Sequence, residues 1–188
     1  MIIKQVRNIH THQRNDKYGY VVCPNPDMNI KIKNIIDEIK NPPTIYNSKV
    51  CVKRQNMYCR NIDDTIEQTI KVMVEKIYTH IPIFENDKLV GVFSENTLLD
   101  IVNKESGIVI SNDTRFKEIQ KNLRIENHSF QEFKFISRNK NIYDIEDIFK
   151  DYFTRNKRLG CVYITENGKE NEKILGMLGM YLVTNNKI

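Results

Sequence analysis

The sequence of 188 residues predicts an α+β protein built from two β-α-β-β-α units in a pseudo-twofold pair, preceded by an N-terminal extension of mixed structure. Three observations predict this fold class. From about residue 50 onward, apolar residues change between strand spacing and helical spacing in a regular order. That order then begins again, and each copy is too short to form a stable core alone. The prolines at residues 42–43 separate the repeat from the preceding chain.

The composition is that of a globular protein. Hydrophobic residues make up 40% of the chain and charged residues 28%, which excludes disorder as the default. No apolar run reaches the roughly eighteen residues of a membrane span, and the first residues contain no apolar segment of signal-peptide length. We therefore expect a cytoplasmic protein with no membrane partner. The four cysteines form no CxxC pair and are expected to be reduced thiols.

The net charge of +5 belongs to the N-terminal third of the chain. Residues 1–60 carry eleven Lys and Arg against four Asp and Glu, a balance of +7, and the other 128 residues carry eighteen against twenty, a balance of −2. Such a basic region can meet nucleic acid, a phosphorylated ligand or an acidic partner, or it can be a solvated surface. Nucleic acid is the less favoured partner, because the helix expected over residues 30–40 is short and carries no long basic stripe.

The extension contains one expected strand and one expected helix. "YGYVVC" (residues 18–23) predicts the strand, and "PNPD" follows as a turn or helix entry. The helix is predicted by four apolar residues at helical spacing: Ile32, Ile35, Ile36 and Ile39. His10 and His12 would share one face of a strand near Cys23, but no second ligand pair stands at metal spacing, so we predict no metal site.

The first unit follows the order strand, helix, strand, strand, helix. "VCV" and "NMYCR" are strand-like, and "DDTIEQTIKVMVEKIY" is a helix that Asp63 or Asp64 can cap, with Glu67 completing a capping box. "HIPIF" and "KLVGVF" are two strands joined by "ENDK", a hairpin signal. "SENT" opens the last helix. The expected apolar faces of the two helices are Ile66, Ile70, Met73, Val74 and Ile77, and then Leu98, Leu99, Ile101 and Val102.

The second unit repeats this order over residues 133–188. "FKFI" is a strand, "NIYDIEDIFKDYF" is a helix, and "LGCVYIT" and "KILGML" are strands around the polar connection "ENGKENE". The helix is expected to bury Ile142, Ile145, Phe149 and Phe153. We align "HIPI" (residues 80–83) with "RLGC" (residues 158–161), and Gly91 with Gly176. The second hairpin is then the longer one, and little room remains for a full last helix.

These two stretches resemble a tandem pair of CBS domains, a Bateman module. The resemblance rests on "DDTIEQTIKVMVEKIYTHIPIFENDKLVGVFSENTLLDIV" and on "NKNIYDIEDIFKDYFTRNKRLGCVYITENGKENEKILGML", and its specificity lies in the repeated order. It implies an extension at residues 1–43, a first unit at 44–105, a connection at 106–132 and a second unit at 133–188. It also implies a non-catalytic, regulatory homodimer that binds an adenine-type ligand between the units: AMP, ADP, ATP, S-adenosylmethionine or cyclic di-AMP.

In the family pattern, the run G-x-x-[ST]-x-x-D supplies a hydroxyl to phosphate and an Asp to the ribose hydroxyls. Gly91 and Ser94 match this run in the first unit, but Thr97 stands at the Asp position. In the second unit Gly179 and Leu182 replace the hydroxyl residue and the Asp. The resemblance implies the ligand-binding residues Lys53, His80, Val92, Ser94, Thr97, Lys157, Arg158 and Met177.

Each of these assignments has a plainer alternative. Ser94 can simply cap the helix that follows it, and Lys157 and Arg158 can be the solvated end of a helix. The sequence contains no P-loop, GxGxxG or HExxH motif and no spaced nucleophile and base, so we expect no catalytic residue. Two alternatives to a nucleotide sensor stay open. One is a scaffold that has lost its ligand and acts on an effector protein, and the other is a nucleic-acid-binding regulator.

Overall fold

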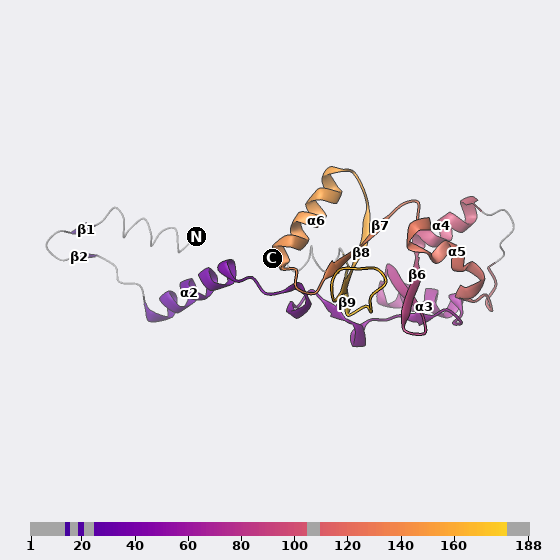
Figure 1. Ribbon diagram of the computed structural model, residues 1–188, viewed down its shortest axis with the longest axis horizontal. Coiled ribbons are helices and arrows are strands. Elements are labelled where there is room, and N and C mark those ends of the chain that lie inside the picture. The colour runs from indigo at the N-terminus through magenta and orange to yellow at the C-terminus, as the bar shows by residue number, and fades with distance from the viewer. Residues whose placement is uncertain (1–13, 16–18, 21–24, 105–109, 180–188) are drawn as a thin grey trace. The chain divides into compact units, whose positions relative to one another are not determined.

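The computed structural model describes residues 14–15, 19–20, 25–104 and 110–179. The chain divides into two compact parts, Met1–Pro42 and Pro43–Ile188 (Figure 1). None of the helices in the described ranges is long and apolar enough to cross a membrane.

The first part contains a short antiparallel pair of strands and one helix. β1 (Arg14–Asn15) pairs with β2 (Gly19–Tyr20), so the described residues of the strand expected at 18–23 are those of β2. The helix is confirmed as α2 (Pro26–Lys40). The Asn25 side chain accepts a hydrogen bond from the Asp27 backbone N–H at 2.7 Å, and a proline at the first helical position needs no donor there.

Among its described residues, the second part contains two sheets, one for each expected unit. The strand expected at "VCV" in the first unit is an exception, because it forms β3 and pairs with β9 in the sheet of the second unit. The first sheet has the order β4-β5-β6 and the second has the order β3-β9-β8-β7. The strands are β3 (Val52–Lys53), β4 (Arg60–Asn61), β5 (His80–Glu85), β6 (Lys88–Ser94), β7 (Glu132–Ser137), β8 (Leu159–Thr165) and β9 (Gly176–Gly179). The helices are η1 (Ile45–Asn47), η2 (Arg54–Asn56), α3 (Ile66–Lys76), α4 (Glu95–Lys104), η3 (Phe116–Ile119), α5 (Gln120–Leu123), η4 (Ile125–Asn127) and α6 (Ile142–Thr154).

The β5–β6 hairpin is confirmed where "ENDK" predicts it. Asn86 and Asp87 both have positive φ values, 48° and 61°, which a tight two-residue hairpin turn requires and which Asn and Asp tolerate. Asp87 then pairs with Arg54 at 3.3 Å and with Lys173 at 2.6 Å. The tip of the first unit's hairpin is thereby tied to the chain that leads into β9 of the second unit, through exposed and individually weak ion pairs.

Strand register corrects the alignment of the two units. Ile83 pairs with Gly91 in the first hairpin, and Ile164 pairs with Gly176 in the second. The two glycines are therefore equivalent, as expected, but Ile83 is equivalent to Ile164. Three residues before Ile83 and Ile164 stand His80 and Cys161, which are therefore equivalent. The expected alignment of His80 with Arg158 is wrong by three residues. The extra residues that cause this shift lie between the start of the second unit's helix and the start of β8, and α6 has 13 residues where α3 has 11.

Each unit completes its core with the chain segment that precedes the other unit. Ile45 and Val50 pack with Ile136, Ile145 and other residues of the second unit. In the same way, three residues of the connection pack into the core of the first unit: Phe116, Ile119 and Leu123. Equivalent backbone bonds hold both segments, since Ile45 N donates to Lys140 O at 2.6 Å and Phe116 N donates to Asp64 O at 3.1 Å.

The described residues form three apolar clusters, one in each unit and one between them. The first unit buries Ile62, Ile66, Ile81, Ile83, Phe93, Ile101, Phe116, Ile119 and Leu123. The second buries Ile45, Val50, Ile136, Ile142, Ile145, Tyr152, Leu159, Val162, Ile164 and Leu178. The cluster between the units, which we call the junction, contains Met57, Phe84, Val92, Phe133, Cys161, Tyr163 and Ile174.

The helix ends differ from the expected apolar faces. Val74 is 76% exposed and Ile77 is 85% exposed, although both continue the helical spacing of α3. Ile77 is the C-terminal cap in a left-handed conformation (φ 57°), which turns the chain away from the core. Phe153 is 86% exposed near the end of α6, and the preceding Tyr152 is buried in its place. The predicted apolar faces therefore hold for the first turns of both helices and fail at the last turns.

The cap expected for α3 is also wrong. The N-cap is Thr65, whose side chain makes no capping bond. Asp64 instead accepts a hydrogen bond from the Asn61 backbone N–H at 2.8 Å and pairs with Arg60 at 3.1 Å. The Asp64 carboxylate therefore stabilises the turn before α3 and does not cap the helix. The capping box predicted for α3 is found in α6, where Asn141 and Asp144 bond reciprocally.

We predict that Gly91→Ala destabilises the protein by about 3 kcal/mol or more, because overpacking at a rigid backbone cannot relax by a side-chain movement. A Cβ atom at Gly91 would lie 2.2 Å from Leu123 O, where the connection crosses β6. Gly179→Ala is the matched control, since a Cβ atom there meets nothing within 4 Å. Urea unfolding of both variants measures the difference, and equal stabilities would contradict this account of the crossing.

Candidate functional site

The candidate site lies where β6 ends and α4 begins. We call it the Ser94 corner and define it by His80, Ser94, Asn96 and Thr97. Ser94 and Thr97 are fully buried, and the Ser94 backbone N–H donates to Thr97 Oγ1 at 3.0 Å. The two hydroxyl oxygens are 3.4 Å apart. Thr97, at the expected Asp position, thus supplies the acceptor that holds the strand end to the first turn of the helix.

A side chain from the end of the connection occupies this corner. Gln131, which directly precedes β7, is 5% exposed. Its Nε2 donates to Ser94 Oγ at 2.9 Å. Its Oε1 lies 2.9 Å from His80 Nε2 and accepts from Asn96 Nδ2 at 3.1 Å. One amide therefore bonds to three of the four residues of the corner.

These partners fix the tautomer of His80. Because Gln131 Oε1 is an acceptor, His80 Nε2 carries the hydrogen, and Nδ1 accepts from the Thr79 hydroxyl at 2.8 Å. Burial lowers the pKa of His80 more than its hydrogen bond to Gln131 and the nearby Glu95 raise it, and Arg158 lowers it further. The imidazole is thus neutral at pH 7, and its hydrogen bonds are those of an uncharged ring.

Phe133 connects the corner to the junction. The His80 ring meets its edge at 6.0 Å between centroids, the His128 ring does so at 5.0 Å, and Tyr163 stacks at 6.4 Å. Burial lowers the pKa of His128 as well, against the effect of its hydrogen bond to Leu123 and of nearby Asp100. Two neutral imidazoles therefore flank one phenyl ring that belongs to the second unit.

Gly160 on β8 allows this close packing. A Cβ atom there would lie 2.9 Å from Phe133 Cε1, 3.0 Å from His80 Nε2 and 3.3 Å from Gln131 Oε1. A glycine inside an otherwise apolar strand is a sequence signal for such close approach. Gln131, Asn96 and His128 give no comparable signal, because isolated polar residues near strand ends are usually solvated.

The other expected ligand residues lie in different surroundings. Val92 is buried in the junction cluster, and Met177 on β9 is partly buried against it, so both act as core contacts. Lys53 is on β3, where its Nζ lies 4.9 Å from the centre of the Tyr46 ring. Of the eight expected residues, the structure brings His80, Ser94 and Thr97 together at the corner.

Lys157 and Arg158 lie directly before β8 rather than at the position equivalent to His80. The Lys157 ammonium forms an ion pair with Glu132 and lowers the pKa of that carboxyl. The Arg158 carbonyl accepts from the Glu132 backbone N–H at 2.8 Å. Cys161 holds the position equivalent to His80, and burial raises the pKa of its thiol to about 12. Leu182, at the second expected Asp position, lies outside the described residues.

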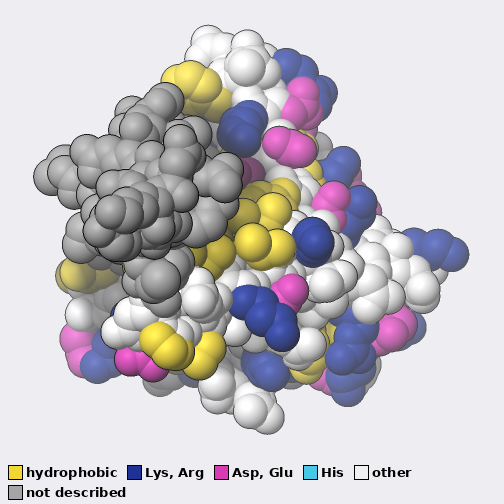
Figure 2. Space-filling model, turned by 90° about the vertical axis from the view of Figure 1, so that its left-hand side faces the viewer, with side chains coloured by type: hydrophobic (Ala, Val, Ile, Leu, Met, Phe, Trp, Pro, Cys, Tyr) yellow, Lys and Arg dark blue, Asp and Glu magenta, His cyan; other side chains and the backbone are white. Residues whose placement is uncertain are grey.

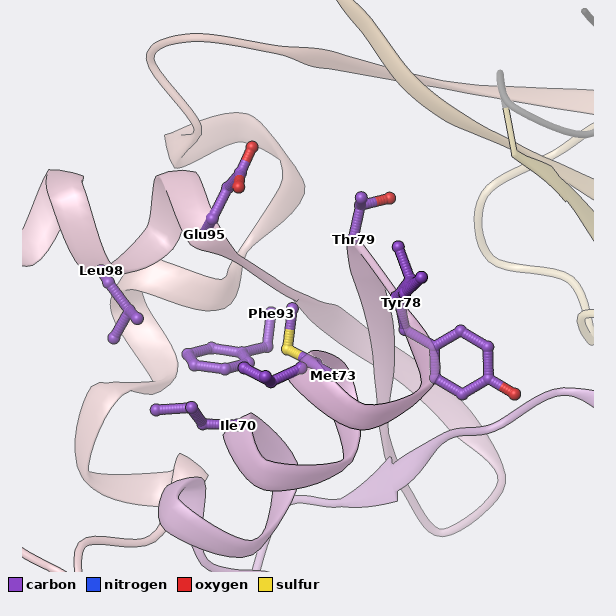
Figure 3. A pocket seen from close by; sticks show the side chains of 9 residues that line it. Ile70, Met73, Tyr78, Thr79, Phe93, Glu95 and Leu98 are labelled. Atoms are coloured by element: carbon purple, nitrogen blue, oxygen red, sulfur yellow. The ribbon is translucent and has the colours of Figure 1, made fainter.

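A shallow apolar hollow of about 350 Å³ opens beside α3 and α4 (Figure 3). The side chains of Ile70, Met73, Phe93 and Leu98 converge on it. Glu95 is also part of its wall. Within the described ranges, no three His, Cys, Asp or Glu side chains gather as metal ligands, and His10, His12 and Cys23 lie outside those ranges.

Comparisons with known proteins agree with this fold. Residues 61–104 match the family model of the CBS domain. AcuB of Vibrio cholerae, named for acetoin utilization, has 12% identity and a TM-score of 0.53 over 77% of this chain and 89% of its own. A conserved domain of unknown function from Neisseria meningitidis MC58 has 11% identity and a TM-score of 0.50 over 97% and 96%. CBSX2 in complex with AMP has 18% identity and a TM-score of 0.48 over 76% and 94%.

No curated protein matches the sequence. At such low identities the structural likeness concerns the fold alone. The family match at residues 61–104 covers the first unit, and residues 132–179 repeat its order of strands and helix. The first unit therefore contains a CBS domain, and the second unit repeats its fold.

We predict that the folded protein loses stability as the pH falls from about 7 to 5.5, and that His80 contributes to this loss. The pKa of His80 is lower in the folded state than the value of about 6.5 that we take for the unfolded chain. Below that value the unfolded chain binds a proton that the fold excludes, so the free energy of unfolding decreases. Urea unfolding at several pH values measures the slope.

His80→Gln removes this proton uptake and is expected to reduce the slope, and His128→Gln is expected to reduce it in the same direction. Lys169→Gln, at an exposed lysine of the second hairpin, is the control and keeps the wild-type slope. An unchanged slope in His80→Gln would show that His80 titrates in the fold as it does in the unfolded chain.

Proposed function

We propose that the protein is a regulatory module without chemistry of its own, and that its signal is a change in the relative position of the two CBS units. One observation carries this proposal. The Ser94 corner belongs to the first unit, yet its polar groups bond to Gln131, the residue of the connection that directly precedes β7 of the second unit. A ligand that enters this corner therefore acts on the contact between the units, which is how binding energy can shift a two-state equilibrium.

We propose an adenine nucleotide as the ligand of this corner. The Ser94 hydroxyl stands at the N-terminus of α4, a helix of ten residues, where phosphate oxygens are favoured by free backbone donors and by the helix dipole. Thr97 offers one hydroxyl where a carboxylate would bind both ribose hydroxyls, so we expect weak ribose selectivity. The candidate ligands are AMP, ADP, ATP, S-adenosylmethionine and cyclic di-AMP.

We predict that AMP at millimolar concentration raises the unfolding temperature of the full chain by a few degrees. A ligand at ten times its Kd stabilises a fold by about 1.4 kcal/mol, and this is a few degrees for a protein of this size. Ser94→Ala removes the corner hydroxyl and is expected to abolish the shift. Ser137→Ala is the control, because that hydroxyl donates to Glu166 O at the far end of β7.

Native mass spectrometry of freshly purified protein complements this measurement, because it records the oligomer and any bound nucleotide together. If none of the candidate ligands shifts the unfolding temperature at millimolar concentration, the nucleotide proposal is wrong.

A ligand-free scaffold is the second candidate function, and two observations favour it. Gln131 already satisfies the polar groups of the corner, and Thr97 replaces the carboxylate. In this case the junction is a fixed contact, and an effector protein recognises the outer surface. A nucleic-acid partner is less favoured, since Figure 2 shows Lys and Arg mixed with Asp and Glu over the coloured part of the visible face.

We propose that two copies of the chain associate through α3 and α4. Val74, Ile77 and Tyr78 are exposed apolar residues at the end of α3 that line the apolar hollow of Figure 3. Leu98 of α4 lines it as well. A contiguous exposed apolar surface of this kind marks an interaction site, whereas single exposed apolar residues do not.

We predict that Val74→Lys weakens a dimer about tenfold or more in Kd, because a lysine ammonium would be buried without a partner. Glu75→Lys is the matched control, since it changes the charge by more but its side chain does not line the hollow. Sedimentation analysis over a concentration series measures both variants. Equal dissociation constants for Val74→Lys and the wild type would place the dimer contact elsewhere.

A further inference from the structure

We propose that Gln131 is a built-in occupant of the Ser94 corner, and that a ligand enters the corner by displacing the Gln131 amide. This inference rests on the proposed function and names how the site is regulated. The corner of the ligand-free protein is closed by the end of the connection, and binding releases this chain segment, which leads into β7.

The bonding of Gln131 is that of a bound ligand rather than that of a surface residue. Its amide uses one oxygen to accept from two donors and one N–H to donate to a hydroxyl, all within 3.1 Å. Buried polar groups left without partners are costly, so each of these bonds favours the closed corner. The same groups, a hydroxyl and two N–H donors at a helix N-terminus, are those that a phosphate or an adenine edge would use.

The corner has no spare room for a ligand beside the amide. The Ser94 side chain is fully buried, and the Gln131 Nε2 atom lies against its hydroxyl. On the side of β8, even a single methyl group at Gly160 would come within 3.3 Å of Gln131 Oε1. Any ligand atom that bonds to Ser94 Oγ must therefore take the place of the amide.

Displacement of Gln131 would act directly on the second unit. The next residue, Glu132, begins β7, donates its backbone N–H to Arg158 O and forms an ion pair with Lys157. The residue after that is Phe133, which packs against His80 and His128 of the same region. Gln131 is thus one residue before Glu132 at the edge of the second sheet and two residues before Phe133 in the junction. A movement of Gln131 is therefore transmitted directly to both.

The repeat supplies a matched control. Arg60 and Ile136 are equivalent, because they pair with Ile83 and Ile164 respectively. Five residues earlier in each unit stand Gln55 and Gln131, so the chain carries a glutamine at the same place twice. Gln55 is exposed, whereas Gln131 is buried.

The test compares the full-length wild type with Gln131→Ala, Gln131→Glu and Gln55→Ala. Without ligand, hydrogen exchange of residues 94–98 and 129–134 is expected to be at least about fivefold faster in Gln131→Ala, because the corner then opens more often. Residues 84–90 of the first hairpin serve as the internal reference. Gln55→Ala is expected to exchange like the wild type.

Isothermal titration with AMP then measures displacement. Gln131→Ala is expected to bind AMP about tenfold more tightly, because the binding-competent open corner is no longer a minor state. Gln131→Glu keeps the size of the side chain and two of its bonds but places a carboxylate where the phosphate would go. It is expected to weaken AMP binding about tenfold or more, and it remains informative if Gln131→Ala folds poorly.

Three results would overturn the inference or its basis, and they can be told apart. Unchanged exchange in Gln131→Ala would show that the amide does not close the corner. Unchanged AMP affinity in both Gln131 variants, with binding by the wild type, would show that AMP binds without displacing it. Faster exchange with no AMP binding by any variant would overturn the proposed nucleotide function, and would leave Gln131 as a structural contact.

Discussion

The packing around Phe133 is the contact on which the rest of the junction depends. Its ring comes from the second unit, lies between the imidazoles of His80 and His128, and stacks on Tyr163. The Phe133 ring stabilises the junction both by the apolar area that it buries and by its T-shaped contacts with the two imidazoles. These imidazoles must stay neutral, because burying a charged ring without a partner is costly. The pKa values of both histidines are lowered for this reason.

The polar corner is a consequence of that packing. Phe133 follows Gln131 by two residues. When the Phe133 ring packs in the junction, the Gln131 amide therefore lies within hydrogen-bonding distance of Ser94. The absence of a side chain at Gly160 then lets β8 approach both residues closely. The packing of Phe133 and the hydrogen bonds of Gln131 are therefore coupled, so that a substitution that disturbs one also weakens the other.

The sequence predicts the local elements well, because their signals are local. The "ENDK" turn fits the two positive φ values of Asn86 and Asp87, and the equivalence of Gly91 and Gly176 is confirmed because each glycine pairs with the matching isoleucine of its own hairpin. The incorrect predictions concern helix caps and helix ends, whose side-chain contacts depend on the surrounding structure rather than on the pattern of the helix itself. Asp64 has a competing partner in Arg60, and the ends of α3 and α6 extend beyond the core that would cover Ile77 and Phe153.

The candidate site was predictable only in part for a related reason. Ser94 and Thr97 belong to a run whose spacing is visible in the sequence, but Gln131 reaches Ser94 from 37 positions away along the chain. Its role follows from the meeting of two units, which no local pattern encodes. The alignment of His80 with Arg158 failed because the second unit holds extra residues between its helix and β8, and strand register alone reveals them.

The reciprocal placement of the two leading segments has a consequence for how such a chain can be built. The segment that precedes the first unit packs into the second, and the segment that precedes the second unit packs into the first. This is the arrangement of a domain-swapped dimer whose two copies have been joined end to end. A single unit cut from the chain, with its own leading segment attached, would have to exchange that segment with a second molecule to complete its core. The covalent connection replaces that second molecule, and so makes folding of the pair independent of protein concentration.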